Sequence, residues 1–79
     1  MKEAEIRQSL REILEEIAPT IELEEADSDK PFDELGYDSL DQSGLLLGIE
    51  EAYGLKIPDE ILSDLKTLDD YVRYVVANG

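Results

Sequence analysis

Residues 38–54 read DSLDQSGLLLGIEEAYG and carry a strong helical signal. Asp38 is a favoured helix-capping residue, and Asp41 follows three positions later, as in a capping box. Gly54 stands at the far end, where glycine commonly adopts the left-handed backbone that closes a helix. The stretch therefore predicts a long helix that begins after Asp38 and ends at Gly54.

This helix has two faces when it is projected at about 100° per residue. The predicted core face contains Leu45, Ile49, Ala52 and Tyr53, with Leu46 at its margin. The opposite face contains Leu40, Ser43, Gly44, Leu47 and Glu51. The projection thus leaves two leucines on the solvent side. Gly44 and Gly48 are each expected to cost about 1 kcal/mol relative to alanine in a helix interior.

Two further long helices are predicted on either side. Before residue 38, Ile6, Leu10, Ile13, Leu14 and Ile17 recur at helical spacing. Pro19 should end that helix near Ala18. Near the C-terminus, Leu68, Tyr71, Val72, Val75 and Val76 repeat the pattern, after a Thr67 and Asp70 cap and before Asn78 and Gly79.

The segment from Pro19 to Asp38 has no helical period and is predicted to be a long loop. Its apolar anchors are Ile21, Leu23, Phe32 and Leu35, and one helical turn is expected from Phe32 to Leu35. Pro58 predicts the start of a short helix of one or two turns. The whole chain, 1–79, is therefore expected to be a single all-α domain: a small bundle of three main helices plus one short helix, with a long loop between the first and second helices.

Composition limits the function. Twenty-one acidic residues against seven basic ones give a net charge of −14, which repels nucleic acid and anionic membranes but favours partners with basic patches. Because 42% of residues are hydrophobic and they recur at helical spacing, disorder is not expected. The chain has no Cys and no His, so zinc sites and the common nucleophilic triads are excluded and the protein is not expected to be an enzyme. The charged N-terminus does not resemble a signal peptide or a membrane span, so a cytoplasmic location and no membrane insertion are expected.

Ser39 is the candidate site of modification. It follows a glycine-containing turn and stands at the predicted start of a helix, where free amide groups and the helix dipole favour an attached or bound anion. A phosphate ester there would be stabilised. The local sequence also fits a plain helix start with no further role.

The wider stretch LGYDSLDQSGLLLGIEEAYGLKIPDEIL, residues 35–62, resembles the acyl carrier protein family, whose hallmark is Asp-Ser-Leu after a Leu-Gly turn. The resemblance implies that a phosphopantetheinyl transferase attaches 4′-phosphopantetheine from coenzyme A to Ser39. The terminal thiol of the arm then carries acyl chains as thioesters for separate enzymes. Asp38 is implied to help hold the Mg²⁺ of the transferase, and the chain itself needs no metal site.

The resemblance also implies a docking surface. Its predicted residues are Leu40, Asp41, Leu47, Glu50 and Glu51. The implied partners are acyl-chain synthases, reductases or acyltransferases with basic docking patches, and the carrier is expected to be a monomer. Gly44 stands where fatty-acid-synthesis members usually have glutamate, and Ser43 where they have an apolar residue. A fatty acid, polyketide or other lipid pathway therefore stays open.

Two alternative functions fit the sequence, and a third does not. A peptidyl, aryl or D-alanyl carrier would share the fold and the serine arm. An unmodified acidic helical adaptor for a basic protein would fit the composition equally well. A calcium-binding loop around Asp27, Asp29 and Asp33 is not supported, since Phe32 stands where an EF-hand needs glycine and Asp38 where it needs glutamate.

Overall fold

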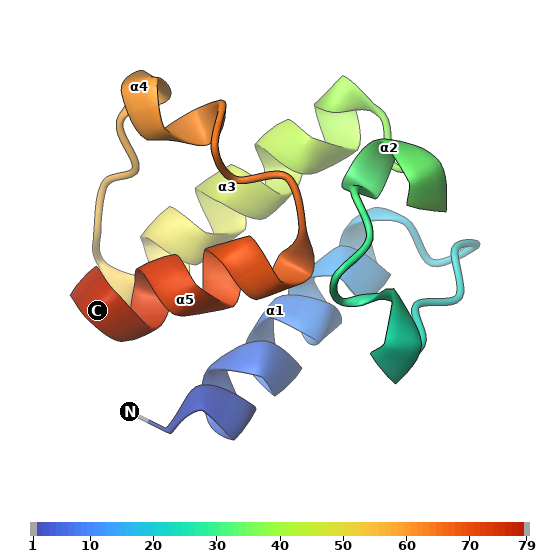
Figure 1. The fold of residues 1–79 in the computed structure, drawn as a ribbon, viewed down its shortest axis with the longest axis horizontal. Coiled ribbons are helices and arrows are strands. Elements are labelled where there is room, and N and C mark those ends of the chain that lie inside the picture. Colours follow the sequence, from blue (N-terminus) through green and yellow to red (C-terminus); the bar gives the residue numbers. More distant parts are fainter. Residues whose placement is uncertain (1, 79) are drawn as a thin grey trace.

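The computed structural model describes residues 2–78, and within them it contains helices and no strand, as predicted. The helices are α1 (Glu3–Ile17), α2 (Phe32–Leu35), α3 (Ser39–Tyr53), α4 (Asp59–Leu62) and α5 (Leu68–Asn78), shown in Figure 1. A 3-10 turn, η1 (Glu25–Asp27), lies in the long loop and was not predicted. Gly79, placed at the end of the last predicted helix, lies outside the described residues.

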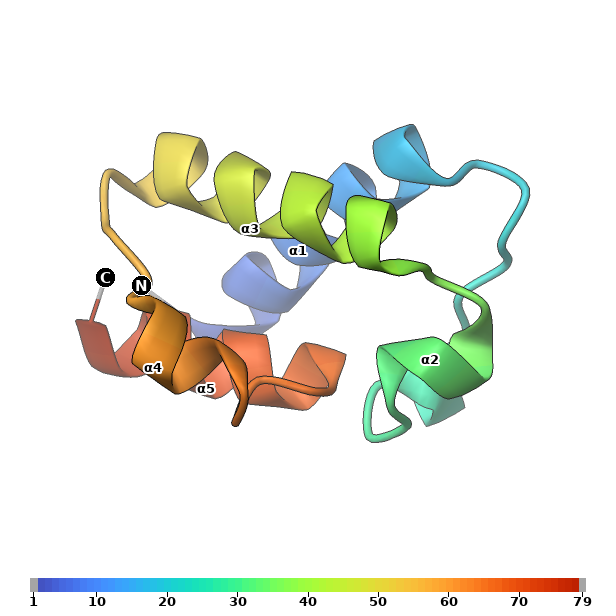
Figure 2. The ribbon, with the colours of Figure 1, turned by 90° about the horizontal axis from the view of Figure 1, so that it is seen from above.

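The helix α1 packs against both α3 and α5 (Figures 1 and 2). The core is formed by these three helices together with residues of α2 and of the connecting segments, and it consists of Ile6, Leu10, Leu14, Ala18, Phe32, Tyr37, Leu45, Ile49, Ile57, Leu65, Leu68, Tyr71, Val72 and Val75. Full burial of one leucine- or isoleucine-sized side chain contributes about 1.5–3 kcal/mol, so apolar contact between the three long helices is the main source of stability.

The long loop is held to the rest of the fold by its own contacts. The predicted apolar anchors, Ile21, Leu23, Phe32 and Leu35, all pack against the core. Two backbone hydrogen bonds join this region to the start of α5 and the residues before it: Phe32 N–H, at the start of α2, donates to the Lys66 carbonyl at 3.0 Å, and Asp69 N–H, in the first turn of α5, donates to the Ser28 carbonyl at 2.9 Å. These bonds fix the segment that leads into α3.

The predicted faces of α3 are only partly correct. Leu45 and Ile49 are fully buried, as expected, but Ala52 is exposed. Gly44 does not face away from the protein, because it lies against Ile17 of α1. The projection was therefore wrong at Ala52 and at Gly44. It could not include the position of α1, which packs against α3 at Gly44 and Gly48.

Glycine makes this close crossing possible. A β-carbon added at Gly48 would lie 2.8 Å from Ile13 Cγ2, and one at Gly44 would lie 3.1 Å from Ile17 Cδ1. Both distances are shorter than a normal carbon–carbon contact of about 3.5–4.0 Å. The two glycines therefore let the isoleucines of α1 reach the backbone of α3, which offsets their low helix propensity.

The last helix begins with the predicted cap. Thr67 Oγ1 accepts from Asp70 N–H at 3.1 Å, and the Asp70 carboxylate accepts from Thr67 N–H at 3.1 Å. Val76, predicted on the apolar stripe, is instead 49% exposed. At about 100° per residue it lies about 80° from Leu68 around the helix, outside the buried stripe.

Candidate functional site

Ser39 is the first residue of α3, and its side chain is exposed. The chain turns sharply before it. Gly36 ends α2 with φ of 96°, a left-handed conformation that favours glycine. This turn brings Asp38 to the N-cap of α3 in extended backbone, as the sequence predicts. The serine is thus presented at the tip of a rigid helix.

Asp38 and Asp41 form the predicted capping box. Asp41 N–H donates to Asp38 Oδ1 at 2.8 Å, and Asp38 N–H donates to Asp41 Oδ2 at 3.2 Å. A cap of this kind contributes about 1 kcal/mol to helix stability. The pair fixes the first turn of α3 and, with it, the orientation of Ser39.

The start of α3 offers free donors. Within residues 2–78, no hydrogen bond uses the backbone N–H of Ser39 or of Leu40, or the Ser39 hydroxyl. Unpaired N–H groups and the positive end of the helix dipole favour a negative group at this position. The residues present therefore suit a phosphate ester on Ser39.

Two residues that the sequence interpretation missed hold this turn in place. Gln42 Nε2 donates to the Tyr37 carbonyl and to Asp33 Oδ1, both at 3.1 Å, and so connects α3 to α2. The Tyr37 ring is buried edge-on against Phe32, with 5.7 Å between the centroids. Burial raises the pKa of the Tyr37 hydroxyl, and the nearby Asp41 carboxylate raises it further. An aromatic residue directly before Asp-Ser-Leu was the available signal for this anchor.

A small cavity of about 160 Å³ lies beside Ser39. Ser39, Gln42 and Ser43 line its polar side, and Leu46, Leu62, Leu65 and Tyr71 line its apolar side. The sequence interpretation placed none of Leu62, Leu65 and Tyr71 near the serine, because they follow α3 by many residues. Their arrangement depends on how α4 and α5 pack back onto α3.

The predicted docking residues do not all lie together. Leu40 is 78% exposed and Leu47 is 60% exposed, as expected, and Glu51 is also exposed. These three follow one another by seven and four positions, so they share one side of α3. Asp41 and Glu50 are partly buried and lie to either side of that line.

Glu50 has an internal partner. Its Oε2 accepts a hydrogen bond from the backbone N–H of Ile57 at 2.9 Å. The carboxylate therefore connects α3 to the segment that leads into α4. The sequence gave no sign of this bond, because Ile57 lies beyond the turn at Gly54.

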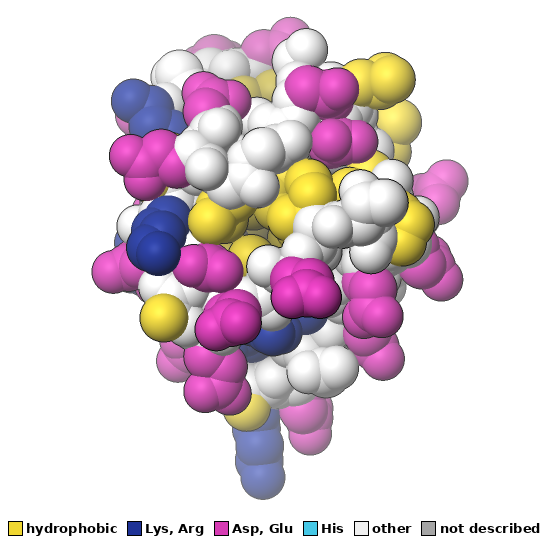
Figure 3. Space-filling model, turned by 90° about the vertical axis from the view of Figure 1, so that its right-hand side faces the viewer, with side chains coloured by type: hydrophobic (Ala, Val, Ile, Leu, Met, Phe, Trp, Pro, Cys, Tyr) yellow, Lys and Arg dark blue, Asp and Glu magenta, His cyan; other side chains and the backbone are white. Residues whose placement is uncertain are grey.

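Carboxylates cover much of the visible surface. Figure 3 shows many acidic side chains, few basic ones and an apolar area near the middle of the face. This distribution matches the net charge of −14. A partner of this face would meet apolar contact inside a negative field, which steers basic proteins.

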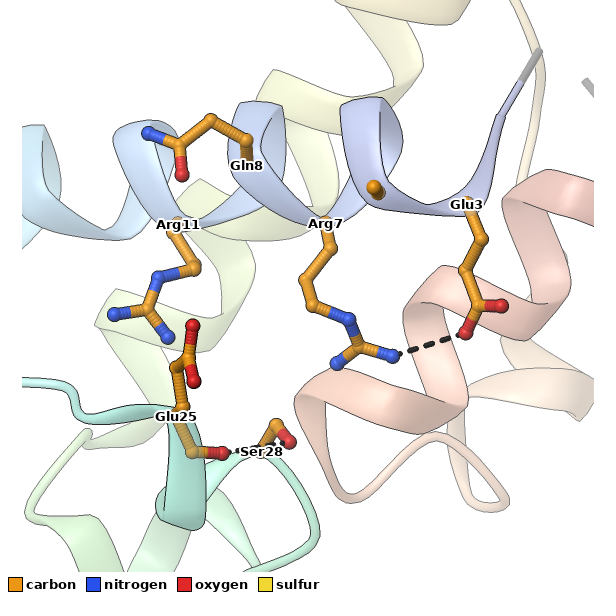
Figure 4. Close-up of a pocket in the computed structure, with 7 residues that line it drawn as sticks. Glu3, Arg7, Gln8, Arg11, Glu25 and Ser28 are labelled. Carbon is orange, nitrogen blue, oxygen red and sulfur yellow. Dashed lines mark hydrogen bonds and ion pairs between the residues drawn. The ribbon is translucent and has the colours of Figure 1, made fainter.

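A larger hollow of about 570 Å³ lies between α1 and η1 (Figure 4). Arg7 and Arg11 extend into it from α1, and Ser28 lies on its other side. Arg11 Nη2 donates to the Leu23 carbonyl at 2.8 Å, so this arginine also fastens the loop. None of the predicted site residues lines this hollow.

The described residues contain neither a cluster of metal-ligating side chains nor a helix that could span a membrane. Among residues 2–78, no group of three or more acidic, cysteine or histidine side chains is placed to hold a metal ion. No helix in the same range is long and apolar enough to cross a bilayer.

Comparison with known proteins identifies the family. The profile described as "Phosphopantetheine attachment site" matches residues 5–75. A meromycolate extension acyl carrier protein of Mycolicibacterium aurum is 43% identical over 72 residues, which cover 90% of this chain and 73% of that protein. An acyl carrier protein of Thermobifida fusca is 38% identical over 74 residues, which cover 92% of each chain. An acyl carrier protein of Rhodococcus erythropolis is 42% identical over 72 residues, which cover 90% of this chain and 78% of that protein. The chain therefore belongs to the acyl carrier protein family, whose members bear 4′-phosphopantetheine and are carriers, not enzymes.

Proposed function

We propose that this protein is an acyl carrier that bears 4′-phosphopantetheine on Ser39. The observation that carries the proposal is the exposed Ser39 hydroxyl at the start of α3, beside backbone N–H groups that have no partner within residues 2–78. Membership of a family with a phosphopantetheine attachment site supports the same assignment.

Each residue of the site has a part in this function. Ser39 supplies the oxygen of the phosphodiester, and the capping box holds the first turn of α3, in which Ser39 lies exposed. The first-turn N–H groups and the helix dipole stabilise the negative phosphodiester. When attached, the group supplies a thiol that carries acyl chains as thioesters, which the chain itself cannot do because it has no cysteine.

Loading requires a phosphopantetheinyl transferase as a partner. The exposed Asp38 carboxylate lies next to Ser39 and uses Oδ1 for the cap. We propose that the Asp38 carboxylate also contacts the Mg²⁺ of the transferase during loading. This role needs only that the other carboxylate oxygen reach the metal.

The proposed cargo is an acyl chain of a lipid pathway. One relative is named a meromycolate extension acyl carrier protein and another an acyl carrier protein, and both names support fatty acyl cargo. The four apolar side chains around the cavity beside Ser39 suit a hydrocarbon better than a polar aminoacyl group. Polyketide, peptidyl, aryl and D-alanyl cargo are the alternatives, and the mass of the loaded arm on protein from the native host distinguishes them.

The proposed docking surface is Leu40, Asp41, Leu47, Glu50 and Glu51. The exposed leucines provide an apolar contact for a partner, and the neighbouring carboxylates attract basic groups around that contact. Synthases, reductases and acyltransferases with basic patches are the proposed partners. The carrier is proposed to act in the cytoplasm as a monomeric single domain over residues 1–79, which light scattering and cell fractionation test.

A loading assay tests the assignment of Ser39. The protein is incubated with coenzyme A, Mg²⁺ and a broad-specificity transferase, and its mass is measured. One phosphopantetheinyl group should be added, Ser39→Ala should remain unmodified, and the matched control Ser43→Ala should load normally. No mass gain in the native chain would favour the unmodified adaptor, and loading of Ser39→Ala would place the arm elsewhere.

A further inference from the structure

An open groove of about 700 Å³ runs between α1 and α3. Its apolar lining comes from the partly buried Ile13 and Ile17 and from the exposed Leu47. Gly44 and Gly48 also line it, and Ile13 and Ile17, which pack against these glycines, remain partly exposed beside them. The groove thus has an apolar part, and no element within residues 2–78 covers it.

The rim of the groove is negative. Glu12 and Glu16 line it from α1, and Glu51 lines it from α3. All three are exposed, and within residues 2–78 none of them forms an ion pair. No lysine or arginine lines the groove. Like charges close together repel one another, so a cationic partner would gain from all three at once.

We infer that this groove docks a basic amphipathic helix of a partner enzyme, with apolar side chains on Ile13, Ile17 and Leu47 and lysine or arginine side chains toward the rim glutamates. The inference rests on the proposed carrier function and extends its docking surface from α3 onto α1. A groove between two helices suits a helical partner, because an amphipathic helix can place the apolar residues of one face into the groove. A second copy of this chain is the wrong occupant, because it would bring more carboxylates to the same rim.

The position of the groove fits a carrier. Gly44 follows Ser39 by five residues in α3, a rise of about 7.5 Å along the helix. Gly44 and Gly48 also lie about 140° and 180° around α3 from Ser39, so a partner seated over them occupies the opposite face of the helix and leaves the serine and its arm accessible.

NMR on the isotope-labelled full chain tests the inference. The probe is a short synthetic peptide of leucine and lysine arranged as an amphipathic helix, and the control peptide replaces leucine with serine at equal charge. Saturable shifts should appear at the amides of Ile13, Ile17, Gly44 and Gly48 with the first peptide only. Shifts centred on Leu62 and Leu65, or equal binding of both peptides, would overturn the groove.

Matched variants separate specific docking from general attraction. Glu12→Lys with Glu16→Lys should weaken binding of the leucine–lysine peptide by about tenfold, since attraction to the peptide lysines is replaced by repulsion at two positions on the rim. Glu22→Lys with Glu34→Lys makes the same charge change at exposed positions outside the groove and should weaken it far less. Equal weakening by both pairs would overturn the inference.

Loading of Ser39 is measured on the same samples, so the two proposals can fail separately. A chain that loads but binds the peptide elsewhere retains the carrier function and overturns the groove. A chain that binds the peptide in the groove but never loads supports the groove as a docking site and overturns the carrier function.

Discussion

The Glu50 carboxylate accepts a hydrogen bond from the backbone N–H of Ile57, with 2.9 Å between Oε2 and the nitrogen. Ile57 is only 5% exposed, so its N–H has little access to water. A buried backbone donor needs a partner, and here a side chain of α3 provides it. Glu50 therefore contributes to the fold, whatever it also contributes to docking.

Glu50→Ala should lower the free energy of unfolding by about 1–3 kcal/mol, because the N–H of Ile57 is left without an acceptor. Glu50→Gln keeps an oxygen at the same position and should lose less. Glu51→Ala is the matched control, since Glu51 is exposed and makes no hydrogen bond within residues 2–78. Urea denaturation measures all three, and an equal loss in Glu50→Ala and Glu51→Ala would contradict the structural role.

Substitution of the two glycines of α3 by alanine should change the stability of the protein in different ways. Gly48→Ala places a β-carbon 2.8 Å from Ile13 Cγ2, a methyl group bonded directly to Cβ and therefore unable to move aside easily. Overpacking costs about 1–3 kcal/mol, which outweighs a gain in helix propensity of about 1 kcal/mol. Gly44→Ala meets only the flexible end of Ile17 at 3.1 Å. Gly48→Ala should therefore destabilise the protein, and Gly44→Ala should leave its stability unchanged or raise it by up to about 1 kcal/mol.

Thermal or urea unfolding of a double mutant isolates the cause. In an Ile13→Ala background the clashing methyl group is absent, so Gly48→Ala should now stabilise the protein through helix propensity alone. If Gly48→Ala costs the same in both backgrounds, contact with Ile13 is not the reason that glycine is required.

Local sequence predicted the fold well wherever local chemistry decides it. The Asp38 and Asp41 cap, the Thr67 and Asp70 cap and the turn at Gly36 all follow from residues within a few positions of one another. The faces of α3 depend on where another helix crosses it, and a helical projection holds no such information. For that reason Ala52 was wrongly predicted on the core face and Gly44 on the solvent face.

The candidate site divides in the same way. Ser39 and its cap belong to one continuous motif and were found from the sequence. Leu62, Leu65 and Tyr71 reach the cavity beside Ser39 only through tertiary packing. Glu50 was interpreted as a free surface charge, because a carboxylate that bonds a distant backbone N–H looks like any other glutamate in a sequence.

Asp70 predicts a specific dependence of stability on pH. Burial raises the pKa of its carboxyl, but hydrogen bonds from the N–H groups of Lys66 and Thr67, together with the Arg73 guanidinium, lower it below its ordinary value overall. A lowered pKa in the folded state gives stability that is present above the unfolded value of about 3.9 and is lost as the pH falls through the folded value. Asp70→Asn should therefore be less stable than the native chain at pH 6.

The difference between the two proteins should shrink as the pH falls from about 4, where the Asp70 carboxyl of the unfolded chain takes up a proton, towards the lower folded pKa, below which the native carboxyl is protonated as well. Titration of the other acidic residues changes both proteins alike, so the difference reports on Asp70. Urea unfolding at a series of pH values measures it. A difference that stays constant or grows on acidification would show that the Asp70 charge is not the source of the stability.

The two faces of α3 give the last prediction. Ile49 is fully buried, so Ile49→Ala should cost about 2–5 kcal/mol through lost burial and the cavity that remains. Leu47 is 60% exposed, and Leu47→Ala should stay within about 0.5 kcal/mol of the native stability. Because Leu47 belongs to the proposed docking surface, its truncation should instead slow loading of Ser39 by the transferase, measured as initial rates on the folded protein. If Leu47→Ala destabilises the chain as much as Ile49→Ala and leaves the loading rate unchanged, the exposed leucine serves the fold and the docking surface lies on another face.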